Sequence, residues 1–283
     1  MEIRLLLDTY GFRAMFSPEL LIMMIIACVF YLRYSGREVD NKGKTSFVFG
    51  LLCSYVALGG PLNLMGHFWF SIHMLQQSVL YLVVPPLLYR GLSPKVFLWL
   101  TEKKMSRQII RIAAHPVLAL FVFNGAFSFY HIPIIFDAAM SNYALHNSLH
   151  ILLFASAFCL WWSVFCPSGS VNAMSDLKKM AYIFLNGFML TPACALIIFS
   201  DKLLYEIYTG ATHLLCLPFY SLTVDKPDIS ISWLTPITDQ QAGGVVMKIV
   251  QEIAYGTILG YVFFQWYKKE KEEAEDPEDP LLV

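Results

Sequence analysis

Histidines are the side chains in this sequence best suited to chemistry, and their spacing places several of them on shared helical faces. His146 and His150 are four residues apart, so on a helix they project from one face. Such a pair can present two imidazoles to one metal ion, and imidazole suits zinc, copper and iron. His73 and Gln77 have the same spacing in another apolar run, with Gln76 beside them. The spacing therefore predicts a metal or proton-relay site around His73 and His150.

A further polar stripe runs through an otherwise apolar segment. Asn124, Ser128 and His131 follow one another at positions i, i+4 and i+7. Polar side chains in a membrane helix face protein or water, because lipid leaves their hydrogen bonds unmet. We therefore expect His131 to face the interior of a bundle and to be a further metal ligand.

Several weaker candidates each have two interpretations. An imidazole at the positions of His67 and His213 often anchors a protein at the lipid headgroups. For each of these residues, a role as an anchor and a role as a metal ligand are equally open. Met74 offers a soft thioether, although methionine in an apolar helix is more often a packing residue. Lys248 and Glu252 are four residues apart and can pair. This pair is either structural or part of metal or proton transfer.

The ligand types indicate which metal to expect. Asp137 and Asp239 are candidate acidic ligands, but the carboxylates near the histidines lack the loop spacing of a calcium site. Imidazole suits copper, and thioether adds a preference for Cu(I). Copper, bound transiently, is therefore the metal that we expect.

The composition indicates where such a site would have to be built. The chain has 283 residues, of which 57% are hydrophobic and 14% charged, and its mean hydropathy is +0.56. Ordinary soluble domains carry about 25% charged residues, so this chain has too little charge to cover a globule in water. The balance of 20 Lys and Arg against 21 Asp and Glu also argues against nucleic-acid binding, which requires a basic patch. We expect a protein embedded in the lipid bilayer.

Apolar helices of about 20 residues cross the roughly 30 Å hydrocarbon core of a bilayer. Seven segments meet this standard: 16–34, 46–65, 68–89, 114–134, 145–166, 179–200 and 243–267. The sequence therefore predicts an all-α polytopic bundle of about seven transmembrane helices over residues 1–267, with an outer loop at 201–242 and no internal repeat.

The distribution of positive charge predicts the orientation of this bundle. With the N-terminus outside, fifteen of the 20 Lys and Arg fall in inner connections or after the last span, as the positive-inside rule requires. The C-terminus is then inside, and residues 268–283 form a cytoplasmic acidic tail that we expect to be disordered. Six of the seven histidines fall on the outer half of the bundle. His115 is the exception, and its place before Pro116 indicates a structural role.

The inner connections offer little chemistry. The chain contains no Walker loop, dinucleotide fingerprint, GxSxG or HExxH motif. We therefore expect neither an enzyme nor a protein driven by nucleotide hydrolysis.

Four segments resemble, in order, the motifs of the multi-span CtaG family of cytochrome c oxidase assembly factors. They are GHFWFSIHMLQQSVLYLVVPPLLYRG (66–91), HIPIIFDAAM (131–140), LHNSLHILLF (145–154) with Trp161 and Trp162 after it, and DQQAGGVVMK (239–248). The resemblance extends over most of the chain and is greatest to the Bacillus-type proteins of caa-type oxidases.

This resemblance implies a factor that matures a haem-copper oxidase in the bacterial plasma membrane, by supplying copper to the catalytic subunit. The oxidase subunits, and a copper-donor protein, would be its partners. The family's motif positions fall on the histidines and acids already named: His73, His131, His146, His150, Asp137 and Asp239. Many members carry another histidine four residues after the HM histidine, where this chain has Gln77. A copper site here would therefore have one imidazole fewer.

Two other functions remain open. A b-type haem can take two histidines from facing helices as axial ligands. Alternatively, the outer loop docks an oxidase subunit without metal, through aromatic residues that would anchor at an interface. These aromatic residues are Tyr205, Tyr208, Phe219, Tyr220 and Trp233.

Overall fold

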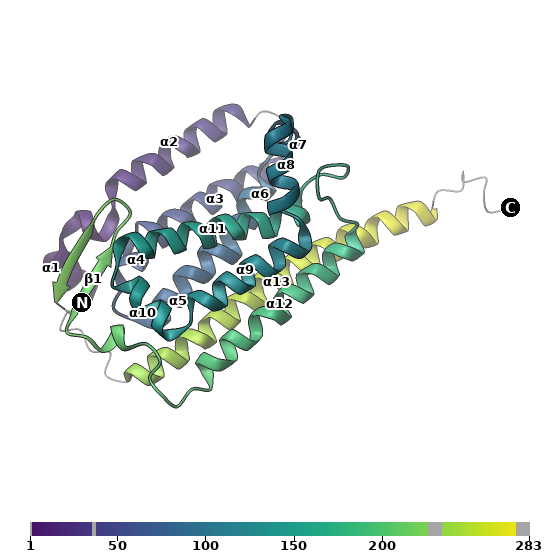
Figure 1. The fold of residues 1–283 in the computed structure, drawn as a ribbon. Helices are drawn as coiled ribbons and strands as arrows, with labels where there is room; N and C mark the ends of the chain where they lie inside the picture. Colours follow the sequence, from purple (N-terminus) through teal and green to yellow (C-terminus); the bar gives the residue numbers. More distant parts are fainter. Residues whose placement is uncertain (1, 36–37, 226–233, 276–283) are drawn as a thin grey trace.

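The computed structural model describes residues 2–35, 38–225 and 234–275, which form a helical bundle with one small sheet (Figure 1). The first helices are α1 (Glu2–Phe16), α2 (Pro18–Tyr34), α3 (Asn41–Leu58), α4 (Pro61–Gly66), α5 (Phe70–Ser78), the π-helical η1 (Val79–Val83), α6 (Val84–Arg90), α7 (Pro94–Leu100) and α8 (Lys104–Ala113). The remainder are α9 (Pro116–Tyr130), α10 (Pro133–Met140), α11 (Tyr143–Phe165), α12 (Asp176–Ile198), the 3₁₀ turn η2 (Glu206–Thr209), strands β1 (Thr212–Cys216) and β2 (Ser221–Asp225), and α13 (Pro236–Glu275).

The two ends of the bundle differ in kind. Figure 1 shows β1, α4 and α10 gathered at one end, which we call the cap end, and α7 and α8 at the other, the basic end. Helices α5 and α11 begin at the cap end and carry His73 and His146 in their first two turns. The structure thus places His73 and His146 at the end opposite α7 and α8, as the predicted orientation requires. Which end faces the outside stays a prediction.

Five segments of the described chain are long and apolar enough to cross a membrane: Leu6–Tyr34, Phe70–Arg90, Tyr143–Phe165, Asp176–Ile198 and Pro236–Glu272. A sixth candidate is the pair α8 and α9, which are bent by 61°. The remaining expected span, 46–65, does not meet the same standard. The break at Gly59 and Gly60 divides it between α3 and α4, and α3 begins with polar residues. The structure therefore fits a membrane bundle but does not confirm the count of seven.

Pro85 and Pro86 do not terminate the third apolar segment, although proline inside a helix commonly kinks or ends it. The chain passes from α5 through the π-helical turn η1 and enters α6, whose first turn holds the prolines. Proline lacks the N–H that a regular helix would use, and wider π turns commonly relieve such a mismatch. The helical path therefore reaches Arg90, before Gly91.

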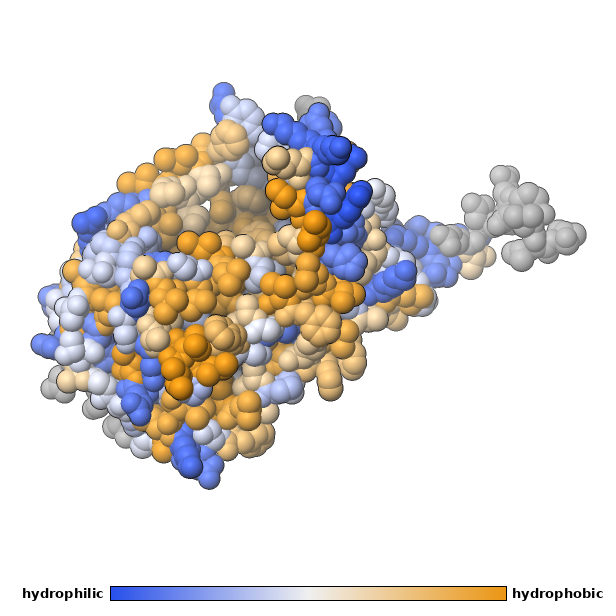
Figure 2. Space-filling model, viewed as in Figure 1, coloured by the Kyte–Doolittle hydropathy of each residue, from blue (hydrophilic) through white to orange (hydrophobic). Residues whose placement is uncertain are grey.

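Helix α8 has the properties of a helix that lies along a membrane surface. Met105 and Ile109 are 77% and 59% exposed on one side, while Arg107 and Arg111 supply charge. Amphipathic basic helices of this type bind at the headgroup level. Figure 2 shows the hydrophilic side chains gathered over α7 and α8, beside an apolar flank. This arrangement explains the bend before α9.

The β1–β2 hairpin closes the cap end. It is antiparallel, and Cys216 is paired with Ser221 at its turn. Leu215 is fully buried and belongs to a small apolar cluster with Phe68, while His213 contacts the Gly210 carbonyl through Nε2 at 3.1 Å. Burial of this apolar surface against the helix ends holds β1, and therefore Cys216, close to the histidines.

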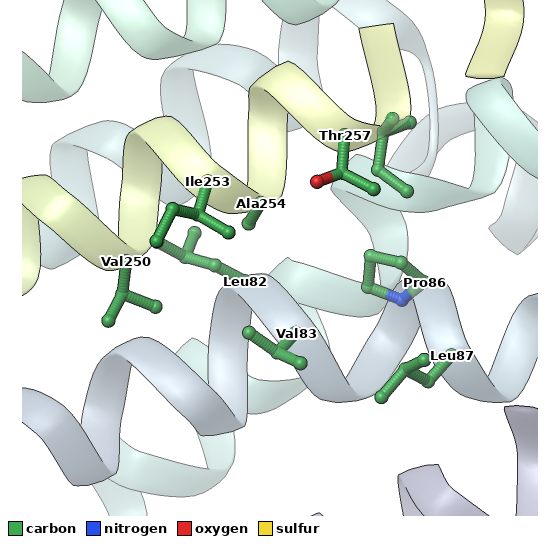
Figure 3. A pocket seen from close by; sticks show the side chains of 9 residues that line it. Leu82, Val83, Pro86, Leu87, Val250, Ile253, Ala254 and Thr257 are labelled. Carbon is green, nitrogen blue, oxygen red and sulfur yellow. The ribbon is translucent and has the colours of Figure 1, made fainter. Parts of the chain in front are cut away.

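An apolar crevice of about 230 Å³ lies between α13 and the η1–α6 segment (Figure 3). Leu82, Val83 and Ile253 are among its lining residues, and Thr257 is its polar member. A crevice with this lining offers no ligand set for a metal.

Helix α13 continues to Glu275, so the described part of the expected acidic tail, 268–283, is helical rather than disordered. Two exposed ion pairs at i, i+4 lie on this helix: Lys268 with Glu272 and Lys271 with Glu275, each at 3.5 Å. Such pairs stabilise a helix by about 0.3–0.5 kcal/mol. Residues 276–283 lie outside the described residues.

Gly243 sets the contact between α13 and α5, and its replacement is expected to destabilise the bundle. A Cβ at this position would lie 2.5 Å from Cδ1 of Phe70, which is 1% exposed. Gly243→Ala should lower the free energy of unfolding by about 1–3 kcal/mol, the usual cost of overpacking. Thermal unfolding in detergent measures this change.

Gly256→Ala in the same helix is the matched control. A Cβ there meets nothing within 4 Å, so the substitution should be neutral or stabilising by up to about 1 kcal/mol. Equal behaviour of the two variants would contradict the close approach of α13 to Phe70.

Candidate metal centre

Four imidazoles from three helical segments form a row at the cap end. His67, His146, His150 and His73 follow one another with ring-centroid distances of 5.8, 4.2 and 6.0 Å. His67, His146 and His73 are buried, at 3%, 5% and 1% exposure. His150 is half-buried because it borders a cavity. We call these residues the imidazole row. It contains three of the four histidines predicted from the sequence, together with the weaker candidate His67.

The inner half of the imidazole row is joined by one amide and two hydroxyl groups. Gln77 Nε2 lies 2.9 Å from His73 Nε2 and 3.5 Å from His150 Nε2. The Tyr130 hydroxyl lies 3.4 and 3.3 Å from the same two nitrogens, and the Tyr81 hydroxyl lies 3.1 Å from His150 Nδ1. Gln77 and Tyr130 thus fill the space between the two imidazoles, where a planar haem bound to both would have to fit.

Gln77 is incompletely satisfied in this position. Its side chain is fully buried, and its Oε1 has no hydrogen-bond partner among the described residues. A buried acceptor without a partner is unfavourable. The Gln77 amide is therefore held by the hydrogen bonds of its nitrogen. Rotation of the side chain away from the histidines would break no hydrogen bond at Oε1.

Cys216 joins the outer half of the imidazole row. One ligand atom from each of His67, His146 and Cys216 lies within 4.8 Å of the other two. His67 Nδ1 donates to the Asn63 carbonyl at 2.9 Å, and its Nε2 accepts the Cys216 amide N–H at 2.9 Å. Burial lowers the pKa of His67 to about 4 and raises that of the Cys216 thiol to about 12. At neutral pH the imidazole is therefore neutral and the thiol is protonated.

His131 lies apart from the imidazole row. Its Nδ1 donates to the Phe127 carbonyl at 2.8 Å, and within the described residues no ring contact connects it with another histidine. Its Nε2 is buried without a hydrogen-bond partner, and the residue borders a cavity of about 980 Å³ beside Pro192. Asn124, from the same stripe, donates to Asn186 at 3.1 Å. Asn124 and His131 are buried in protein as expected, whereas Ser128 is exposed, and His131 does not face the other histidines.

The two acidic candidates accept hydrogen bonds from the backbone. Asp239 accepts from the amides of Phe70 at 2.7 Å and Ser71 at 3.3 Å, at the beginning of α5. Asp137 accepts from the first two amides of η2, both at 3.3 Å. Carboxylates at helix starts satisfy N–H groups that lack partners within the helix. Burial raises the pKa of Asp137, against the opposite effect of these amides. The structure thus gives both residues a positioning role.

The remaining candidates lie outside the imidazole row. Lys248 and Glu252 form the expected pair, at 2.6 Å, and Lys248 also donates to Thr191 at 2.7 Å. The Glu252 side chain is 63% exposed. Met74 is fully buried in the core, and a Cβ on Gly243 would come within 3.1 Å of it. These contacts indicate helix packing between α12, α13 and α5.

Two of the five outer-loop aromatics are part of the interior, and Tyr220 is half-buried. Tyr205 and Tyr208 are 1% and 5% exposed, and Tyr205 stacks on Phe70 at 4.5 Å. Phe219 is 48% exposed, and Trp233 lies outside the described residues. Tyr205 and Tyr208 therefore stabilise the cap end instead of presenting a docking surface.

Sequence reasoning missed Tyr81, Tyr130 and Cys216. Tyr81 follows Gln77 at the same interval that separates Gln77 from His73, so extending that face by one step would have found it. Tyr130 directly precedes a predicted ligand. Cys216 has no local signal, because it is 149 positions away from His67 and approaches only through the hairpin.

A comparison with known protein families finds a match over most of the chain. A family model described as cytochrome c oxidase caa3 assembly factor matches residues 24–269. That range includes the whole imidazole row and Cys216. No curated protein and no solved structure matches the chain significantly.

Proposed function

The chain belongs to the cytochrome c oxidase caa3 assembly factor family, and from this premise we propose that it holds copper at the imidazole row. It would deliver this copper to the catalytic subunit of a haem-copper oxidase in the bacterial plasma membrane. A copper-donor protein would load it. Copper is then the cargo of the protein, and the oxidase is its client.

The observation that carries this proposal is a buried imidazole nitrogen without a hydrogen-bond partner inside the row of four histidines, among the described residues. Within the part of the chain that the structure describes, His146 Nδ1 is buried without a hydrogen-bond partner, and its ring stacks on that of His150 at 4.2 Å. Leaving a buried polar atom unpaired costs about 1–3 kcal/mol. A bound metal ion would satisfy a lone pair on that nitrogen, and it explains why such an arrangement is tolerated.

The character of the donors also favours copper. The imidazole row contains nitrogen donors, and the carboxylates of Asp137 and Asp239 are occupied by backbone amides. Imidazole suits copper, whereas calcium and magnesium require oxygen ligands. A site of this kind adds no buried negative charge of its own, which matters because charge is expensive within a membrane.

Gln77→His should strengthen copper binding. Gln77 Nε2 already lies 2.9 Å from His73 Nε2, and an imidazole there would replace a donor N–H by a lone pair directed between His73 and His150. We expect about a 10-fold gain in affinity, comparable with the effects of well-placed groups around metal sites. Competition with a Cu(I) chelator on the purified protein measures it.

Gln265→His provides the control, because Gln265 is exposed on α13 far along the chain from the imidazole row. It adds an imidazole without adding a ligand to the site. If both variants bind copper with the affinity of the unmodified protein, copper does not occupy the space between His73 and His150.

The function itself is tested in cells that lack this chain but produce the oxidase. We expect the oxidase subunits to be made and inserted, but the purified oxidase to be deficient in copper and inactive. Expression of the chain should restore both properties. Full copper content in oxidase purified from the deficient cells would overturn the proposal.

A further inference from the structure

The hairpin brings a thiol to the outer half of the imidazole row. Cys216 ends β1 and is 4% exposed. One ligand atom each from Cys216, His67 and His146 lie within 4.8 Å of one another. An ion with three metal–ligand bonds of roughly 2.0–2.3 Å holds its ligand atoms about 3.7 Å apart. A contraction of about 1 Å would therefore complete a three-coordinate site.

Two of the three donors are ready to bind. In residues 2–35, 38–225 and 234–275, His146 Nδ1 has no hydrogen-bond partner, and Cys216 is a free thiol. His67 Nε2 accepts the Cys216 amide N–H, so the same contact that occupies its lone pair also holds the cysteine beside it. Metal binding at His67 Nε2 would replace the hydrogen bond from the Cys216 amide by a metal–nitrogen bond. The existing hydrogen bond thus preorganises the set.

A cavity connects this cluster with the interior of the imidazole row. Its volume is about 350 Å³, and His146, His150 and Cys216 all border it. Leu20 of α2 and Leu58 of α3 form part of its apolar wall. An ion bound near Cys216 therefore has a direct path to His150, and from there to His73, whose ring is 6.0 Å from that of His150.

We propose that Cys216, His67 and His146 form the entry site for Cu(I), from which the ion passes along the imidazole row. This inference rests on the proposed copper function and adds to it the soft ligand and the oxidation state. Thiolate with imidazole selects Cu(I) over harder ions. On binding, the sulfur–hydrogen bond breaks, the sulfur–copper bond forms, and the proton leaves to water at the cap end. Copper is neither oxidised nor reduced.

The test compares Cu(I) binding by the full chain and by Cys216→Ser in detergent without oxygen. Affinity is measured against a chelator, and X-ray absorption at the copper edge detects sulfur at roughly 2.2–2.3 Å. We expect copper–sulfur scattering in the unmodified protein, its loss in Cys216→Ser, and a fall in affinity of about 10-fold or more.

Cys194→Ser is the matched control, because Cys194 is equally buried but contacts Gln251 Oε1 at 3.8 Å instead of a histidine. It should leave affinity and scattering unchanged. Cys216→Ala serves as a second variant if the serine variant does not fold, and the unmodified protein is informative by itself.

The outcomes separate this inference from the function on which it rests. Copper bound with nitrogen scattering alone, or with affinity that does not depend on Cys216, would overturn the entry site and leave copper delivery standing. Zinc bound in preference to Cu(I) would likewise overturn it. Failure of the unmodified chain to bind Cu(I) at all would overturn the copper function together with the entry site.

Discussion

His146→Ala is expected to reduce the affinity for copper by about 100-fold or more. Groups that merely orient a metal ligand contribute about 10–100-fold in affinity, and removal of a ligand should cost at least as much. His146 occupies the centre of the imidazole row, 5.8 Å from His67 and 4.2 Å from His150 between ring centroids. Its loss therefore affects both halves of the site. Chelator competition and metal analysis of the purified variant give the result.

His115→Ala is the control for this substitution. His115 is exposed at the start of α9 and lies outside the imidazole row. The His115→Ala variant should retain the copper affinity of the unmodified protein. That result would exclude a general effect of removing an imidazole. Unchanged affinity in His146→Ala, in protein that unfolds at the usual temperature, would show that copper is held elsewhere.

Asp239→Ala is expected to destabilise the protein by about 2–4 kcal/mol, because it removes a buried charged acceptor from amides that have no other partner. The Asp239 carboxylate is 6% exposed and accepts from the Phe70 amide at 2.7 Å, from the Ser71 amide at 3.3 Å and from the Ser71 hydroxyl. These hydrogen bonds fix the start of α5. The first two turns of α5 carry His73 and Gln77. Thermal unfolding in detergent measures the loss.

Asp239→Asn separates this positioning role from metal binding. The asparagine keeps one oxygen that can accept from the Phe70 amide, so most of the stability should return. Copper affinity should return with it, because the carboxylate itself is not a ligand in this account. A stable Asp239→Asn protein that has lost copper would instead identify Asp239 as a ligand.

The apolar segments were predictable because a bilayer imposes length and hydropathy on a helix. The positions at which these segments end or break were less predictable. The 46–65 segment contains Gly59 and Gly60 before Pro61, and these residues end α3 before the expected span is complete. The 114–134 segment divides at His131 and Pro133, where α9 ends and α10 begins. Hydropathy averages over such positions, whereas glycine and proline act on individual backbone bonds.

The site was predictable only where its members share a helix. The intervals from His146 to His150 and from His73 to Gln77 are local, and both produced the expected contacts. The approach of His73 to His150 depends on how α5 packs on α11, which no spacing within one helix determines. The position of Cys216 depends further on the hairpin, whose burial brings two distant parts of the chain together.

The acidic residues show why residue type alone does not identify ligands. Asp137 and Asp239 were candidates because they are carboxylates on the predicted outer side and fall on motif positions of the family that the sequence resembles. In the structure each faces a helix start, where unpaired amide N–H groups attract a carboxylate. A metal ion and a helix start both favour a nearby carboxylate, so the two roles can be distinguished only from the folded structure.

Metal analysis together with an optical spectrum of one gently purified sample is the most direct test of copper binding at the imidazole row. We expect copper in an amount equal to the protein and no haem absorbance, with the copper lost in His146→Ala. Protein free of copper after purification from copper-replete cells would contradict it, as would a haem absorbance band.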